Sequence, residues 1–351
     1  MLLGLRMPLS EIREKAWREL LDFTWRQWAQ AGVSASVEGA DRWAIDPEAL
    51  ILFTLAVAKR DPRLFDETLD WMAANRGILN MQRLRNLSRR FPLDPRLVGA
   101  VTAWIGDPVP ALILEERDLP SGEVPVFSRD VLSFVREPDP VFAEYGYIRP
   151  RVVRSGKSGE PDLKVRANFA FQLRHLFGPG SRSEVIRILL TFTDGPLDAA
   201  RISDEAGFAK RNVSATLASL VAAKVVKARW SGNERHFIAY RDKWATLLEI
   251  GPSQKFLPEF ISWVHLFPAC LEVVDWLDRM SETEESDYLL SSHARDLINR
   301  IAPDLTMAGL DVSPNLSDHG AAYLPAFIGT VDSLLAKLGT VPLSGHGRQG
   351  G

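Results

Sequence analysis

Residues 199–226 read AARISDEAGFAKRNVSATLASLVAAKVV and carry the clearest periodic pattern in the chain. Apolar side chains recur there at helical spacing, so that each of two helices turns one face inward. Gly207 separates the two helices, and glycine permits a tight turn that a side chain would strain. The pattern predicts helices over residues 199–206 and 210–223 that pack against each other. Their inward-facing residues are Ile202, Ala206, Val213, Leu217, Leu220 and Val221.

The neighbouring segments supply further helices and a hairpin. Residues 168–177 have a helical pattern that ends at a Gly-Pro-Gly sequence. Ser181 and Glu184 have the spacing of a capping box at the start of the next helix. Residues 225–230 and 235–240 alternate like strands around a turn, which predicts a β-hairpin. The predicted order is therefore a run of helices followed by a hairpin.

This order of elements is that of the winged helix-turn-helix. Residues 199–226 resemble the DNA-reading segment of MarR- and ArsR-like transcription regulators, and the resemblance covers residues 164–243. It implies that the second helix of the pair places its outward face in the major groove of DNA. It also implies that the tip of the hairpin, where Arg235 stands, contacts the minor groove or the phosphate backbone.

The outward face of the helix over residues 210–223 lies opposite its apolar side. Arg211 and three alanines occupy the centre of this face, and short polar residues flank it. The residues expected to read the groove reach base edges from this face, and they are Lys210, Arg211, Asn212, Ser214 and Thr216. The residues expected to hold the backbone are basic and lie on the hairpin, and they are Lys227, Arg229 and Arg235.

Charge is segregated along the chain. Residues 164–243 contain 14 lysines and arginines against 7 aspartates and glutamates, a net charge of +7. The whole chain carries −3, so the remaining residues carry −10. A basic segment on an acidic body is typical of a nucleic-acid-binding module. Because each phosphate contact releases counterions, binding to double-stranded DNA is expected to weaken steeply as the salt concentration rises.

The whole chain predicts a mainly α protein of several regions. Residues 1–106 form a helical N-terminal domain, 107–163 a proline-rich irregular connector and 164–243 the winged helix-turn-helix. Residues 244–343 form a helical C-terminal region. The glycine-rich tail, residues 344–351, is expected to be disordered.

Aspartate-proline pairs mark helix starts in the N-terminal domain. Asp46, Asp61 and Asp94 each precede a proline, so that the carboxylate caps the first turn and proline takes the first helical position. The predicted helices cover residues 10–30, 47–59, 62–75, 80–90 and 95–105. In the C-terminal region, Pro268 is expected to break or restart a helix. The tryptophans expected in the N-terminal core are Trp17, Trp25, Trp28, Trp71 and Trp104.

Several classes of function find no support in the sequence. The single cysteine, Cys270, excludes an intramolecular disulfide and a multi-thiolate zinc site. The six histidines share no metal-ligand spacing and no catalytic grouping is legible, so we expect no metal, cofactor or catalysis. The longest apolar run, residues 50–58, is shorter than the roughly 20 residues of a membrane helix. Without a secretory signal pattern, the chain is expected to be soluble and cytoplasmic, with no membrane partner.

We therefore hypothesise a DNA-binding transcriptional regulator that acts without catalysis, with helical flanks that form a homodimer or bind a partner or effector. The alternative is a non-catalytic protein-interaction module in which the winged helix is a packing element. A third hypothesis is an enzyme whose active site lies in the helical flanks. Exposure of Arg211 and its neighbouring alanines distinguishes the first hypothesis from the second, because a packing element would bury them.

Overall fold

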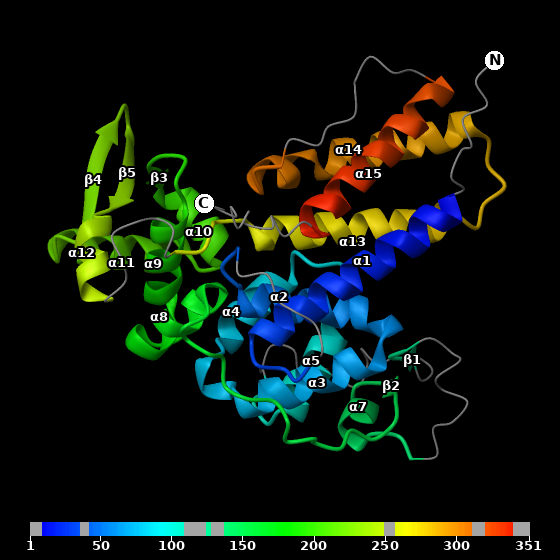
Figure 1. Cartoon of the computed structure of the whole chain (residues 1–351), viewed down its shortest axis with the longest axis horizontal. Helices are drawn as coiled ribbons and strands as arrows, with labels where there is room; N and C mark the ends of the chain where they lie inside the picture. The colour runs from blue at the N-terminus through cyan, green and yellow to red at the C-terminus, as the bar shows by residue number, and fades with distance from the viewer. Residues whose placement is uncertain are drawn as a thin grey trace, which may run out of the picture.

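The computed structural model describes residues 9–35, 42–108, 124–127, 137–248, 257–310 and 320–339. The chain is mainly helical, as predicted, and its strands are short. Figure 1 shows the N-terminal helices beside those of the C-terminal part, with a β-hairpin at one end of the molecule. The tail that the sequence predicts to be disordered lies outside the described residues.

Three of the N-terminal helices begin where the aspartate-proline pairs predict. Asp46, Asp61 and Asp94 are N-caps, and each carboxylate accepts a backbone N–H at 2.9–3.2 Å. Proline is the first helical residue in each case, so the predicted capping is confirmed. The helices are α1 (Leu9–Gln30), α2 (Pro47–Val57), α3 (Pro62–Ala74), α4 (Met81–Ser88) and α5 (Pro95–Trp104), with 3₁₀ turns at Ala58–Arg60 and Arg76–Ile78.

Short elements and extended chain follow α5. They are β1 (Val124–Pro125), α7 (Pro140–Glu144), β2 (Tyr147–Ile148) and the 3₁₀ turn Arg166–Asn168. The strands β1 and β2 pair in parallel. Residues 149–165 contain neither helix nor strand. They lie along the N-terminal helices, where the N–H of Gly159 donates to the carbonyl of Gly32 at 3.0 Å.

The segment between the two terminal regions folds into helices and a small sheet. Its elements are α8 (Phe169–Phe177), α9 (Ser181–Thr191), β3 (Leu197–Asp198), α10 (Ala199–Ala206), α11 (Lys210–Ala222), β4 (Val226–Ser231), β5 (Glu234–Ala239) and α12 (Arg241–Leu247). The predicted helices and the hairpin are present, and Gly207 ends α10 at φ +67°. The antiparallel sheet has the order β3-β5-β4. The strand β3 is not predicted, because two residues are too few to show alternation.

The predicted capping box at the start of α9 is wrong. Gly180 is the N-cap and Ser181 is already the first helical residue. The Ser181 hydroxyl lies 3.0 Å from that of Thr216, and Glu184 turns inward to bond two buried arginines. The spacing fits a capping box, but the buried arginines take the carboxylate instead.

The C-terminal helices are α13 (Trp263–Met280), α14 (Asp287–Met307) and α15 (Tyr323–Gly339), the last preceded by a 3₁₀ turn at Gly320–Ala322. The expected break at Pro268 does not occur, because α13 runs through this residue. Proline removes a single backbone hydrogen bond there, while the apolar side chains on both sides stay buried in the core. Burial of the apolar helix face outweighs the loss.

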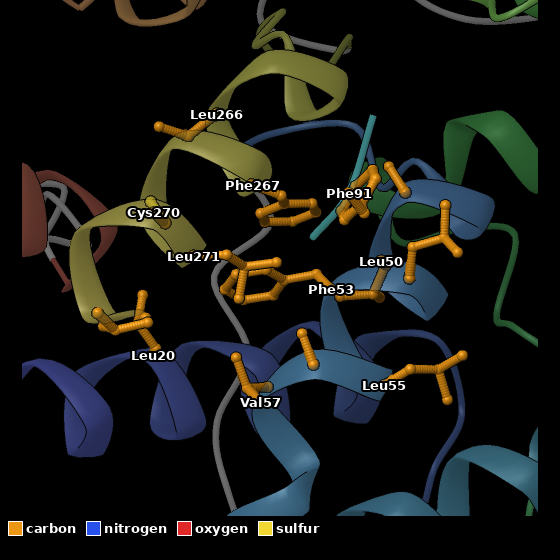
Figure 2. Close-up of a cluster of buried hydrophobic side chains, with 14 of the residues drawn as sticks. Leu20, Leu50, Phe53, Leu55, Val57, Phe91, Leu266, Phe267, Cys270 and Leu271 are labelled. Carbon is orange, nitrogen blue, oxygen red and sulfur yellow. The ribbon is translucent and has the colours of Figure 1, made fainter. Parts of the chain in front are cut away.

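The N-terminal and C-terminal helices share one hydrophobic core. Figure 2 shows Leu20 of α1, Phe53 of α2 and Phe267 of α13 among its side chains, and the two phenylalanine rings stack with centroids 4.2 Å apart. A second core lies between α8, α9, α10, α11 and the sheet. The predicted domain boundaries stay predictions. Five tryptophans are expected in the first core. Trp17, Trp28 and Trp71 are buried there, and Trp25 and Trp104 are partly buried against it.

Six buried charged side chains join the two cores, and we call them the buried ionic cluster. They are Asp46 before α2, Glu48 of α2, Arg83 of α4, Arg174 of α8, and Glu184 and Arg187 of α9. Arg174 Nη2 lies 2.6 Å from Glu48 Oε2 and 2.7 Å from Glu184 Oε1. Three carboxylates balance three guanidinium groups, and the paired charges hold α8 and α9 on the N-terminal helices.

The charges of the buried ionic cluster stabilise one another against the cost of burial. Burial raises the pKa of Glu184, but Arg83, Arg187 and Arg174 outweigh it and hold this pKa well below its ordinary value. The pKa of Asp46 is lowered in the same way, with Arg83 opposing the effect of burial. Arg174, Arg187 and Glu184 therefore contribute no accessible charge to the basic segment.

One helix in the described part of the chain, Gly320–Leu338, is long and apolar enough to cross a membrane by length and composition. Core helices pass the same test. Tyr323, Leu324 and Phe327 of this helix are at most 1% exposed and belong to the core that the terminal regions share. Of the candidate span as a whole, 39% is buried inside the protein.

Candidate nucleic-acid interface

The outward face of α11 is exposed. No described element covers the side chains of Lys210, Arg211, Asn212 and Ser214. The alanines of the same face are also exposed, and they are Ala215, Ala218 and Ala222. The opposite side of the helix packs in the second core through Val213, Leu217 and Leu220. The elements that the structure describes thus leave this face of α11 uncovered.

Thr216 does not belong to this face. Its side chain is buried, and its hydroxyl lies 3.0 Å from the Ser181 hydroxyl of α9. The expectation that Thr216 reads a groove is wrong, because it follows Val213 by three residues and so lies on the same inward side of the helix. It joins α11 to α9 instead.

The start of α11 is a positive helix end. Ala209 is its N-cap and supplies no side-chain hydrogen bond, so the first N–H groups lack a capping side chain. The helix dipole adds partial positive charge at this end, where Lys210 and Arg211 also lie. Such an end favours an anion such as a phosphate.

The hairpin carries the basic side chains predicted for it. Arg229 and Arg235 are exposed and Lys227 is half-buried. Across the strands, Arg229 pairs with His236 and Trp230 pairs with Arg235. Because side chains alternate between sheet faces, Lys227 and Arg229 share one face, while Arg235 lies with Trp230 on the other. The hairpin therefore presents positive charge on both faces.

Trp230 is a candidate contact residue that the sequence analysis does not single out. Its side chain is 72% exposed although it shares a sheet face with the buried Val226. Strand alternation from Val226 could have placed it on this face, beyond the end of the core. A groove of about 330 Å³ lies between the hairpin and the start of α11. Its lining includes Lys210, Ser214, Trp230, Asn233 and Arg235.

The turn before α11 is fixed on the N-terminal helices. Arg83 Nε of α4 donates to the carbonyl of Ala206 at 2.7 Å, and Asn86 Nδ2 donates to the carbonyl of Gly207 at 3.0 Å. These bonds satisfy carbonyls at the end of α10 and set the direction in which α11 leaves the turn. The contacts with α4 thus fix the start of α11 from the side opposite its exposed face.

Several exposed cations of this surface have no salt-bridge partner among the described residues, although the carboxylates of Asp198 and Glu234 line the same groove. Within the described residues, Lys210, Arg211 and Arg229 form no salt bridge. Exposed cations that gather without partners attract an external polyanion. We call the outward face of α11 together with the hairpin the basic surface.

Known proteins give no further guide to this surface. No protein-family model, curated protein or solved structure matches the chain. Its function is therefore inferred from the geometry and charge of its own residues.

Proposed function

We propose that this protein binds double-stranded DNA through the basic surface and acts as a transcriptional regulator without catalysis. The arrangement of α9, α10, α11 and the hairpin is then a winged helix-turn-helix. The observation that carries the proposal is the exposed, unpaired row of polar and basic side chains on α11. A helix of this kind fits the major groove, which is about 12 Å wide.

Each part of the basic surface has a distinct task in the proposed complex. Arg211, Asn212 and Ser214 face the base edges, where arginine reads guanine and asparagine reads adenine. Lys210 and the positive start of α11 hold a phosphate. Arg229 and Arg235 hold the backbone beside the groove, and Trp230 packs its ring on the sugars or bases that the hairpin meets.

A single winged helix contacts few base pairs, so a regulator of this kind needs a second reading head. We propose that the helical flanks form a homodimer or bind a partner protein or effector, and a homodimer or a DNA-binding partner would supply this second head. Light scattering of the free protein and of its DNA complex measures the stoichiometry directly.

The second candidate function is a protein-interaction module. It is favoured by the contacts of α10 with α4, which join this segment to the rest of the chain as in a packing element. Those contacts use the back of the segment, however, and leave the basic surface uncovered. A partner of this surface would therefore be acidic, and the binding experiment below separates it from DNA.

The proposal is tested by fluorescence anisotropy with random and selected duplexes over a range of salt concentrations. The logarithm of the binding constant should fall linearly with the logarithm of salt concentration, by about 0.9 for each phosphate contacted. Arg211→Ala should weaken binding to a selected duplex by about 1–3 kcal/mol, or roughly fivefold to 150-fold. Arg18→Ala is the matched control, because Arg18 is an exposed arginine on α1.

The control should bind as the unaltered protein does. The proposal would be refuted if the protein showed no salt-dependent binding to any duplex. It would also be refuted if Arg211→Ala bound DNA with unchanged affinity. Capture of one acidic protein in fixed stoichiometry, without nucleic acid, would support the interaction module instead.

A further inference from the structure

Three side chains of types that can bind metal ions lie together on one face of the sheet, the face that also carries Arg229. Asp198 ends β3, and Glu234 and His236 lie on β5. One ligand atom from each lies within 4.8 Å of the other two. The register explains this, because Asp198 is directly opposite His236, and Glu234 precedes His236 by two residues and so shares its sheet face. We call these residues the sheet triad.

The histidine of the sheet triad has an unused ligand atom. His236 Nδ1 is shielded from solvent and has no hydrogen-bond partner in the described chain. A shielded polar atom without a partner is costly, and an ion bound through this nitrogen would remove the cost. Imidazole nitrogen is also a common ligand for divalent transition metals.

The two carboxylates are arranged differently. Asp198 caps α10, and its Oδ1 accepts N–H bonds from Ala200 at 2.7 Å and Arg201 at 2.8 Å. Such bonds fix the orientation of a ligating carboxylate before a metal arrives. Glu234 is exposed and forms no salt bridge within the described residues. Arg229 lies opposite His236 on the same sheet face, but its guanidinium group forms no salt bridge with the two carboxylates of the triad.

We propose that the sheet triad binds one divalent first-row transition-metal ion, with Mn²⁺ and Zn²⁺ as the ions best suited to it. One imidazole and two carboxylates are a mixed donor set that both ions accept. Three protein ligands leave positions for water. The site departs from the sequence-based expectation of no metal, because Asp198 is far along the chain from Glu234 and His236, and the fold alone brings them together.

Metal binding at the sheet triad also strengthens binding to DNA, a consequence that rests on the proposed function. Asp198 and Glu234 put two negative charges on the sheet whose hairpin faces phosphates. A divalent ion offsets both charges. Because its ligands come from β5 and from the junction of β3 and α10, the ion would also link these two elements. Arg235 lies near the start of β5. Both effects favour the hairpin geometry that contacts the backbone.

The site is tested first without DNA. Untagged full-length protein is titrated with Mn²⁺, and the loss of the free-ion electron paramagnetic resonance signal gives stoichiometry and affinity; Zn²⁺ is then tested as a competitor. We expect one Mn²⁺ per chain. Binding should be at least tenfold weaker in Glu234→Gln, in His236→Gln and in Asp198→Asn, where asparagine keeps the N-cap of α10. Thermal unfolding checks that each variant is folded.

Two variants serve as matched controls. His175→Gln and Asp194→Asn replace an exposed histidine and an exposed aspartate outside the triad, and both should bind Mn²⁺ as the unaltered protein does. Absence of Mn²⁺ and Zn²⁺ binding, or equal binding by folded Glu234→Gln and His236→Gln, would overturn the proposed site.

The effect on DNA is measured separately. Mn²⁺ should tighten binding of the unaltered protein to a duplex more than it does for His236→Gln, which corrects for screening of phosphates by the ion. If Mn²⁺ binds at the triad but no duplex binds at any salt concentration, the metal site stands and the proposed function fails. If DNA binds but Mn²⁺ and Zn²⁺ do not, the metal site fails alone.

Discussion

His265 shows how a single residue ties the C-terminal helices to the segment that carries the basic surface. Its Nδ1 lies 2.6 Å from Asp304 Oδ1 of α14, and its Nε2 lies 2.6 Å from Asp204 Oδ2 of α10. An ionised carboxylate only accepts hydrogen bonds, so the ring donates to both aspartates only when both of its nitrogens carry hydrogen and it is charged. Burial lowers the pKa of His265, but the bonds to Asp204 and Asp304 outweigh burial and raise it.

We predict that this contact stabilises the protein at acidic to neutral pH and weakens as the pH rises. A histidine with a raised pKa contributes its full stability below its ordinary pKa and loses it as the pH passes the raised value. The contribution of Asp204 is lost only in strong acid, because its bond to His265 outweighs burial and lowers its pKa to about 2. The unfolding temperature of the unaltered protein should therefore fall as the pH is raised from 5 to 9, and it should fall less in His265→Gln. A His175→Gln control should decline as the unaltered protein does, and equal profiles for all three would contradict the prediction.

Single residues were predictable where the chain's local geometry decides their role. Asp46, Asp61 and Asp94 cap the helices that follow them, and a cap needs only neighbours in sequence. The role predicted for Glu184 is wrong because residues distant in the sequence decide it, whereas the spacing of Thr216 from Val213 already places Thr216 on the inward side of its helix. The arginines of the buried ionic cluster bind the Glu184 carboxylate, and no pattern in the neighbouring sequence indicates such partners.

At the scale of elements, the turn between α10 and α11 sets the direction of the exposed helix. Gly207 has φ +67°, a conformation that costs other residues about 1–2 kcal/mol. A Cβ added there would also lie 2.8 Å from Leu87 Cδ2 of α4, and because Leu87 is fully buried, its side chain could shift only by disturbing its packed neighbours. The turn is thus constrained both by its own backbone and by the helix on which it rests.

We predict that Gly207→Ala lowers the free energy of unfolding by about 2–5 kcal/mol, from left-handed strain plus overpacking against α4. Gly232→Ala is the matched control, because Gly232 has φ +60° and nothing within 4 Å of an added Cβ. It should cost only the strain, about 1–2 kcal/mol. Urea unfolding measures both values. Equal losses for the two variants would show that α4 does not restrict the turn, whereas a Gly207→Ala/Leu87→Ala double variant should lose less than the sum of its single changes.

The elements themselves were largely predictable from periodicity and turn residues. The helices α10 and α11 and the hairpin follow the spacing of apolar residues around Gly207 and the turn at Gly232. Two features were not predictable. The strand β3 is defined by its pairing with β5 and not by its own two residues, and α13 continues through Pro268 because the core holds both sides of the helix.

At the scale of the whole molecule, the sequence predicted separate helical regions but not how they meet. The first core contains side chains from α1 and α2 and from α13, which lie far apart in the chain. The buried ionic cluster joins this core to the second one, with partners in α2, α4, α8 and α9. Helical periodicity identifies a buried face, but it does not say which other face covers it.

We predict that Glu48→Gln, which removes one carboxylate of the buried ionic cluster, lowers the free energy of unfolding by about 3–5 kcal/mol. Arg83 and Arg174 both pair with Glu48, so the change leaves an uncompensated positive charge in a site that water does not reach. Glu259→Gln is the control, because Glu259 pairs with Arg42 at the surface and is 60% exposed. That variant should change stability by no more than about 1 kcal/mol.

The same variant tests whether the cluster makes the two cores unfold together. In the unaltered protein, far-ultraviolet circular dichroism and tryptophan fluorescence should follow a single urea transition, because the paired charges transmit the loss of one core to the other. Once Glu48 is neutral, the junction is the weakest part of the molecule, and the second core should separate before the tryptophan-rich first core unfolds. Transitions that no longer coincide would reveal this. A Glu48→Gln variant with unchanged stability and coincident transitions would mean that the junction depends on apolar contacts and not on its charges.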